Sequence, residues 1–117
     1  MGKGMYPQHG ETPQKREDLM PADAAKVASH MYKVVLENDR VRVLEVRGKP
    51  GDKADMHSHP ASVAIFVAGA HLRFTFPDGQ TGEGELKTNE VRYIEPIEHA
   101  PEITGSQELH MFVVELK

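Results

Sequence analysis

The pattern of apolar and polar positions changes near residue 31. From there on, short segments rich in Val, Ile, Leu, Tyr and Phe are separated by turn residues roughly every 8–12 positions, a spacing typical of β-sandwiches and barrels. Residues 30–37 and 41–47 flank an Asn38-Asp39 turn signal and predict a hairpin. The apolar run 62–68 predicts a strand covered on both faces. Further strands are expected at residues 71–76, 81–86, 89–94 and 108–116, with a hairpin turn at 77–80.

The N-terminal residues have a different composition. Residues 1–20 are rich in Gly, Pro, Gln and charge and have few groups to bury. They predict an arm that is flexible or orders only against a partner subunit. Residues 21–28 suit either a short helix, with Pro21 in its first turn, or an extended segment. We therefore divide the chain into an irregular N-terminal arm, residues 1–30, and an all-β domain, residues 31–117.

Composition and charge narrow the function classes. The chain has 117 residues, 38% hydrophobic and 27% charged, which predicts one domain with a modest core. No apolar run approaches the roughly 20 residues of a membrane span, and the polar N-terminus predicts a cytoplasmic protein. The lack of cysteine excludes disulfides and cysteine-based zinc sites or nucleophiles. A net charge of −4 with interspersed signs argues against nucleic acid as a partner.

A His-x-His pair, His57 and His59, stands directly before the apolar run. Residues i and i+2 of a strand share one face, about 6–7 Å apart, so both imidazoles can turn towards one metal ion. Pro60 lacks an amide proton and is expected to interrupt the sheet before the chain resumes at Ser62. Such a pair needs at least one more ligand from elsewhere in the domain.

These residues resemble the first motif of the cupin superfamily, G-x5-H-x-H-x(3,4)-E-x6-G, through Gly51, His57, His59 and Gly69. A degraded second motif follows at Asn89-Glu90-Val91, where His99 stands one residue early and Ile97 and Ile103 replace the usual glycine and asparagine. The resemblance covers roughly residues 32–117. It implies a double-stranded β-helix, or jelly roll, and a divalent metal held in the barrel.

The glutamate of motif one is absent, since Ser62, Val63 or Ala64 stands where it is counted. The resemblance then implies a three-histidine site of His57, His59 and His99, suited to iron, zinc, nickel or manganese. Some cupin dioxygenases use a three-histidine iron. Either Ser62 or a water is expected to take the place of the missing glutamate.

Other side chains are weaker candidates. We expect His71 and His110 to be hydrogen-bonded core histidines, with His110 a substrate contact if it faces the interior. Three side chains suit an anionic substrate, although no pattern singles them out: Arg73, Arg92 and Tyr93. The phenylalanines predict core packing or an apolar pocket wall: Phe66, Phe74, Phe76 and Phe112.

The functional hypothesis is a metal-dependent dioxygenase or isomerase with a barrel pocket for a small organic molecule. Two alternatives remain open: a non-catalytic module that binds a small molecule or metal, and a metal-free barrel. The resemblance also implies a homodimer, with the arm adding a strand to the open sheet edge of a second copy.

Overall fold

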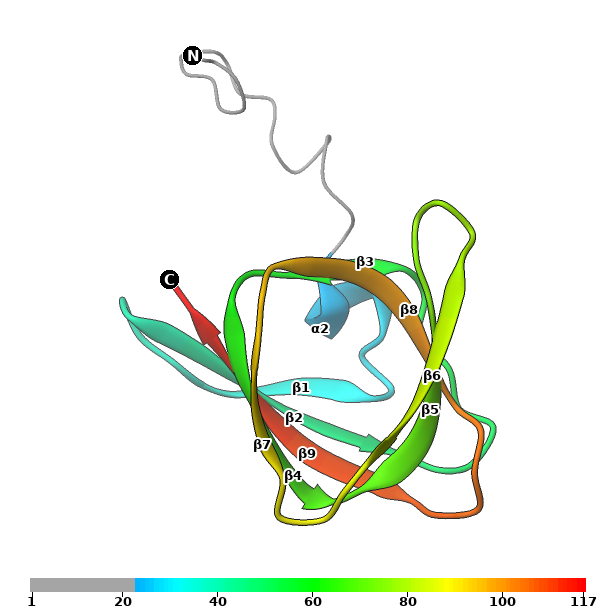
Figure 1. The fold of residues 1–117 in the computed structure, drawn as a ribbon. Helices are drawn as coiled ribbons and strands as arrows, with labels where there is room; N and C mark the ends of the chain where they lie inside the picture. Colours follow the sequence, from blue (N-terminus) through cyan, green and yellow to red (C-terminus); the bar gives the residue numbers. More distant parts are fainter. Residues whose placement is uncertain (1–22) are drawn as a thin grey trace.

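The computed structural model describes residues 23–117, which form two antiparallel β-sheets around a common interior (Figure 1). The five-stranded sheet has the order β1-β2-β9-β4-β7, and the four-stranded sheet has the order β3-β8-β5-β6. Their bounds are β1 Tyr32–Glu37, β2 Val41–Gly48, β3 His57–His59, β4 Ser62–Ala68, β5 Ala70–Thr75, β6 Thr81–Leu86, β7 Val91–Ile94, β8 Ile97–Ile103 and β9 Leu109–Leu116. The predicted all-β, double-stranded β-helix class is confirmed.

The turn chemistry of the sequence accounts for both predicted hairpins. Between β1 and β2, the side-chain oxygen of Asn38 accepts hydrogen bonds from the backbone amides of Arg40 and Val41. Between β5 and β6, Gly79 has a positive φ of 87°, and the Asp78 carboxylate accepts from the Gln80 amide. Local side-chain acceptors of this kind stabilise tight turns and thereby set the strand register.

The core lies between the two sheets, on the inward face of each strand. Leu44, Val46 and Ile103 are at most 1% exposed, and Ala64 and Phe66 of β4 are also buried. The alternate residues of β4, Ile65 and Val67, are 37% and 44% exposed. The prediction that residues 62–68 are covered on both faces is therefore wrong, because within the described chain nothing covers the outer side of the five-stranded sheet.

Part of the predicted arm packs onto the domain. A short helix, α2 (Ala24–Val27), contacts β1 and β3, and Ala24 and Ala28 are fully buried in the core. Asp23 forms a parallel bridge with Ser58 next to the His-x-His strand. Residues 1–22, the rest of the arm, lie outside the described residues. No helix in residues 23–117 is long and apolar enough to cross a membrane.

The motif glycine Gly69 joins β4 to β5 at a close backbone approach. A Cβ atom there would lie 1.8 Å from the Leu86 carbonyl oxygen and 2.7 Å from the Lys87 carbonyl carbon. We expect Gly69→Ala to lower the free energy of unfolding by about 3 kcal/mol, because backbone cannot move aside as a side chain can. Gly84→Ala on β6, where nothing lies within 4 Å, is the matched control. Urea unfolding of both variants checks this, and equal stabilities would contradict it.

Candidate metal centre

Three histidines meet at one end of the barrel interior. His57 and His59 point inward from β3, and His99 on β8 is the cross-strand partner of His57. Each offers a ring nitrogen, and these nitrogens lie within 4.8 Å of one another. The strand break at Pro60 is present, since β3 ends at His59 and β4 begins at Ser62. The structure thus brings together the three histidines that the motifs indicate.

Unpartnered nitrogens mark this cluster as unusual. Within residues 23–117, Nε2 of His57 and both ring nitrogens of His99 are buried without a hydrogen-bond partner. Nδ1 of His57 donates to the Asp55 carbonyl oxygen over 2.7 Å, which leaves the Nε2 lone pair free. Buried polar atoms without partners are costly, and a bound ion would satisfy Nε2 of His57 and one ring nitrogen of His99. The donor set fits a divalent transition metal.

The protonation states also suit metal binding. Burial lowers the pKa of His57 to about 4. Burial, with the neighbouring histidines His59 and His57 as smaller causes, lowers the pKa of His99 to about 3. Both rings are therefore neutral at pH 7, the form in which imidazole binds a metal.

These shifts predict an acid-sensitive apoprotein. Below pH 6.5 the unfolded chain protonates both histidines, whereas the folded chain does not until about pH 4 or 3. Acid therefore favours unfolding, and we expect the free energy of unfolding to fall by about 2–4 kcal/mol between pH 7 and pH 5. Urea unfolding of chelator-treated protein measures this. His99→Asn should flatten the slope, His71→Asn should leave it unchanged, and a flat wild-type profile would contradict the prediction.

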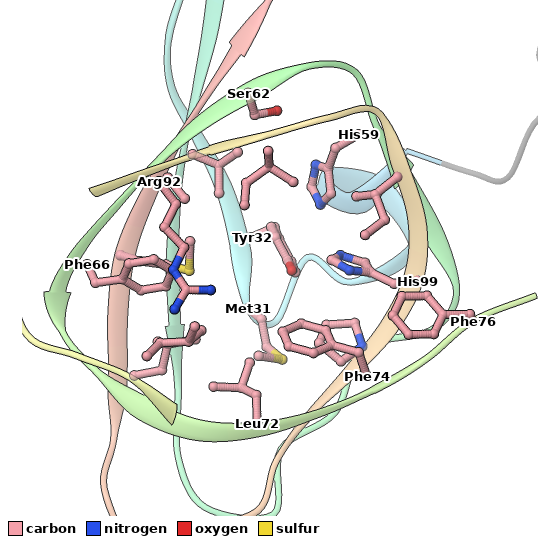
Figure 2. A pocket seen from close by; sticks show the side chains of 18 residues that line it. Met31, Tyr32, His59, Ser62, Phe66, Leu72, Phe74, Phe76, Arg92 and His99 are labelled. Carbon is pink, nitrogen blue, oxygen red and sulfur yellow. The ribbon is translucent and has the colours of Figure 1, made fainter. Parts of the chain in front are cut away.

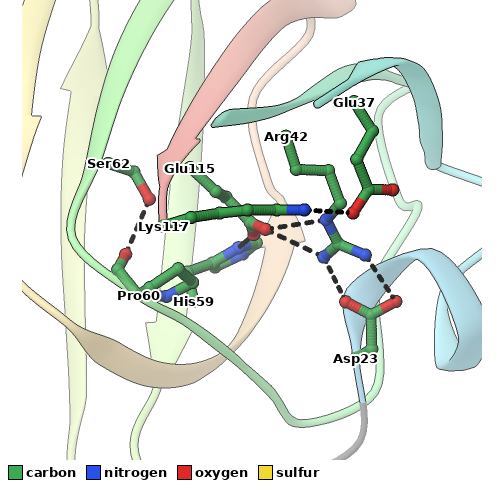
Figure 3. A network of polar contacts seen from close by, with 8 residues as sticks. All are labelled: Asp23, Glu37, Arg42, His59, Pro60, Ser62, Glu115 and Lys117. Atoms are coloured by element: carbon green, nitrogen blue, oxygen red, sulfur yellow. Dashed lines mark hydrogen bonds and ion pairs between the residues drawn. The ribbon is translucent and has the colours of Figure 1, made fainter. Parts of the chain in front are cut away.

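Glu115 on β9 is the functional residue that the sequence analysis missed. Its carboxylate is 3% exposed and accepts a 2.6 Å hydrogen bond from Nδ1 of His59 (Figure 3). Arg42 donates to the other carboxylate oxygen over 2.9 Å and also pairs with Asp23. A carboxylate on Nδ1 fixes the ring so that Nε2 faces a metal, and it makes that nitrogen more basic.

The register explains how this carboxylate relates to the missing motif glutamate. Ser62, which stands at one of the glutamate's expected positions, is the cross-strand partner of Glu115. The Ser62 hydroxyl donates to the Pro60 carbonyl oxygen over 2.7 Å, so its proton is engaged locally. The Glu115 carboxylate therefore comes from β9, the strand that pairs with β4, and it contacts Nδ1 of His59. The sequence pattern does indicate this position, because Glu115 continues the alternation of the inward-facing residues Leu109, Met111 and Val113 on β9.

A cavity of about 200 Å³ opens beside the histidines (Figure 2). His59 and His99 line it, and His57 is fully buried next to them. The Tyr32 ring packs edge-on against His57, with 5.0 Å between the ring centroids. The Phe74 ring stacks on His99, with 5.3 Å between the ring centroids. The remaining wall is almost entirely apolar, with Met31, Phe66, Leu72, Phe76 and Met111 among its residues.

The other candidate side chains differ in whether they line this cavity. Arg92 lines the cavity. Arg73 lies on β5 and pairs instead with Glu83 and Glu102. Tyr93 is 59% exposed. The His71 side chain is 42% exposed and bonds Thr104, so the expectation of a core position is wrong there. His110 is half-buried and bonds Glu45 over 2.8 Å. It packs near Phe112, away from the cavity that Met111 lines.

The chain matches no family model and no curated protein. Solved structures do resemble it. A cupin domain from Bordetella pertussis Tohama I superposes with a TM-score of 0.68 at 25% identity, covering 74% of this chain and 92% of that one. An RmlC-like cupin from Methanocaldococcus jannaschii has a TM-score of 0.57 at 14% identity, covering 97% and 93%. A double-stranded β-helix domain protein from Klebsiella pneumoniae gives 0.56 at 20%, covering 73% and 75%.

Fold and site together define a class: a small double-stranded β-helix whose barrel holds a histidine triad beside an apolar cavity. That class and the structural neighbours identify the chain as a member of the cupin superfamily. The histidine triad is a group that can hold a metal.

Proposed function

We propose that this cupin binds one divalent transition metal through His57, His59 and His99 and acts on a small organic molecule in the adjacent cavity. The observation that carries the proposal is the set of buried imidazole nitrogens beside the cavity that have no partner in residues 23–117. Iron, zinc, nickel and manganese suit the three neutral nitrogen ligands. A bound ion supplies Lewis acidity or, if it is iron, oxygen chemistry, and dioxygenase or isomerase activity fits this role.

The chain's own residues prepare the site. The Asp55 carbonyl and the Glu115 carboxylate each hold an Nδ1–H, which turns the opposite nitrogens of His57 and His59 towards the centre. The largely apolar wall of the cavity makes it an unfavourable place for water. Burial raises the pKa of Tyr32, so its phenol stays protonated and can donate a hydrogen bond.

A non-catalytic binding module is the second candidate. It is favoured by the lining of the cavity, which within the described chain contains no Asp or Glu to act as a general base. Turnover separates the two: the enzyme consumes substrate or oxygen with its metal loaded, and the module binds without consumption. The cytoplasmic location stays a prediction from the sequence.

Elemental analysis of untagged protein tests the metal proposal. We expect about one equivalent of a transition metal in the protein as purified or after reconstitution with iron, zinc, nickel or manganese. No metal after all four reconstitutions would overturn the proposal and leave a metal-free barrel. Metal that binds without any detectable turnover of a substrate panel would favour the binding module.

We also propose a homodimer formed through the outer sheet face, defined by Ile65 and Val67 of β4 and Val91 and Tyr93 of β7. Val91 and Tyr93 are 62% and 59% exposed, and Val91 pairs with Ile65 across the sheet. Contiguous exposed apolar patches on a sheet mark contact surfaces, and a twofold axis lets the same patch serve both copies.

Light scattering tests this interface against the arm. We expect the full chain to have twice the monomer mass of 13.0 kDa, and Val91→Glu to reduce it to the monomer. Deletion of residues 1–22, which spares the buried Ala24 and Ala28, should leave the dimer intact. Monomers from the deletion alone would instead assign the dimer to the arm, and a monomeric wild type would refute both.

A further inference from the structure

Among the described residues, the polar side chains that line the cavity include one cation and no anion. Five polar side chains line it, and two of them are already engaged: Ser62 donates to Pro60, and Nδ1 of His59 donates to Glu115. His99 belongs to the metal centre. Two groups are left for a ligand, the Tyr32 hydroxyl and the Arg92 guanidinium. In residues 23–117 no carboxylate lines the cavity.

The Tyr32 hydroxyl lies at the metal end. Its residue is 6% exposed, its ring contacts those of His57 and His59, and its oxygen points into the cavity (Figure 2). The phenol has no hydrogen bond to any residue of the described chain. A hydroxyl that faces the cavity can donate to an acceptor that enters beside it.

The Arg92 guanidinium lies at the opposite, more exposed side. Its Nε donates to the Glu90 carboxylate, whose other oxygen accepts from the Lys87 amide. This pairing fixes the side chain and turns its two terminal nitrogens towards the cavity (Figure 2). Glu90 reduces the net charge at this point. The two N–H donors form a fork that matches the two oxygens of a carboxylate. This geometry therefore contributes more to the selection of a ligand than the reduced charge does.

We propose that the cavity selects an apolar molecule with acceptor oxygens at two ends: a carboxylate held by Arg92 and a carbonyl or enolate oxygen held by Tyr32 beside the histidines. Amines are excluded, because within residues 23–117 no carboxylate lines the cavity to pair with a buried ammonium, and the Arg92 guanidinium repels it. The volume of about 200 Å³ exceeds the roughly 150 Å³ that admits benzene, so one aromatic ring or a branched chain fits. This inference rests on the proposed function, in that the cavity beside the histidines is the binding site.

A set of related probes tests each end of the molecule. 3-Benzoylpropanoate carries a ring, a ketone and a carboxylate. 4-Phenylbutanoate lacks the ketone, and butyrophenone lacks the carboxylate. 4-Phenylbutylamine lacks the ketone and carries a cation in place of the carboxylate, so its matched acid is 4-phenylbutanoate. We would measure their binding to the zinc-loaded and the chelator-treated full chain by calorimetry. The full probe should bind most tightly, losing about tenfold without the carboxylate and about threefold to tenfold without the ketone. The amine should not bind.

Variants of Arg92 and Tyr32 test which side chain causes each loss of binding affinity. Arg92→Met should reduce binding of 3-benzoylpropanoate to the level of butyrophenone, while Arg73→Met, an arginine outside the cavity, should have no effect. Tyr32→Phe should reduce it to the level of 4-phenylbutanoate, while Tyr93→Phe on the exposed outer face should not. Tighter binding of the amine, no binding of any acid, or no effect of Arg92→Met and Tyr32→Phe would overturn the proposal.

Measurements on the zinc-loaded and the chelator-treated protein test this inference separately from the proposed function. In chelator-treated protein Arg92 is the one Lys or Arg side chain of residues 23–117 that lines the cavity, so the selectivity for the carboxylate should persist without metal. A chain that binds no metal but keeps this selectivity would refute the metal proposal alone. A chain that binds metal and shows no preference for the acid would refute the substrate class alone.

Discussion

Replacing His57 or His99 with alanine is expected to abolish stoichiometric metal binding. Within residues 23–117, each of these two residues supplies one nitrogen of a group of three that lie within 4.8 Å of one another. Two neutral imidazoles without a carboxylate leave a divalent ion mostly solvent-bound. The affinity should fall by more than about 100-fold, beyond the 10–100-fold typical of residues that merely support a ligand. Zinc titration against a chromophoric chelator measures the loss.

Matched controls come from the histidines outside the cluster. His71→Ala and His110→Ala remove imidazoles that bond Thr104 and Glu45, and neither should change the zinc affinity. Circular dichroism of each variant verifies the fold. If only His57→Ala loses metal, the degraded second motif contributes no ligand. If all four variants bind alike, the ion lies elsewhere.

Short-range patterns in the sequence are sufficient to predict most of the fold. Turn residues such as Asn38 and Asp78 act on their own backbone neighbours, and a two-residue period places His57 and His59 on one face. These features depend on the local chain, so a single sequence exposes them. The fold class and the association of the histidines follow from this, together with the motif spacing.

Features that depend on register between distant strands were not predicted. Glu115 contacts His59 only because β9 pairs with β4 and places it opposite Ser62. Arg92 lines the cavity while the adjacent Tyr93 faces outward, a difference set by which face of β7 meets the interior. The exposed outer face of β4 was missed for a similar reason, because apolar side chains on both faces of a strand look alike whether a layer or solvent covers them.

Glu115 links the fold to the site through a chain of polar contacts that runs from Asp23 through Arg42 and Glu115 to His59 (Figure 3). Asp23 precedes α2, so the packing of this helix against the barrel positions the carboxylate that holds a candidate ligand. Burial acts to raise the pKa of Asp23, but the hydrogen bond and the charge of Arg42, with a smaller effect of Lys26, together lower it and keep that carboxylate ionised. Removing one member leaves the others buried without a balanced partner.

We therefore expect Glu115→Gln to weaken zinc binding by about 10–100-fold. Glutamine can still accept from Nδ1 of His59, but its neutral oxygen does not raise the basicity of the ring. Glu115→Ala should in addition lower the free energy of unfolding by about 3–5 kcal/mol, since it leaves Arg42 short of a buried partner. Urea unfolding of metal-free protein and competitive zinc titration measure the two effects separately.

The control is Glu37→Gln, which removes a half-exposed carboxylate that pairs with Lys117 at the surface. It should leave both the stability and the zinc affinity unchanged, because an ion pair exposed to solvent contributes little. A Glu115→Gln variant with wild-type zinc affinity would show that the carboxylate only holds the strands together. A weaker affinity with little loss of stability would instead assign it the role of orienting His59, because a purely structural contact affects folding and not the ligand.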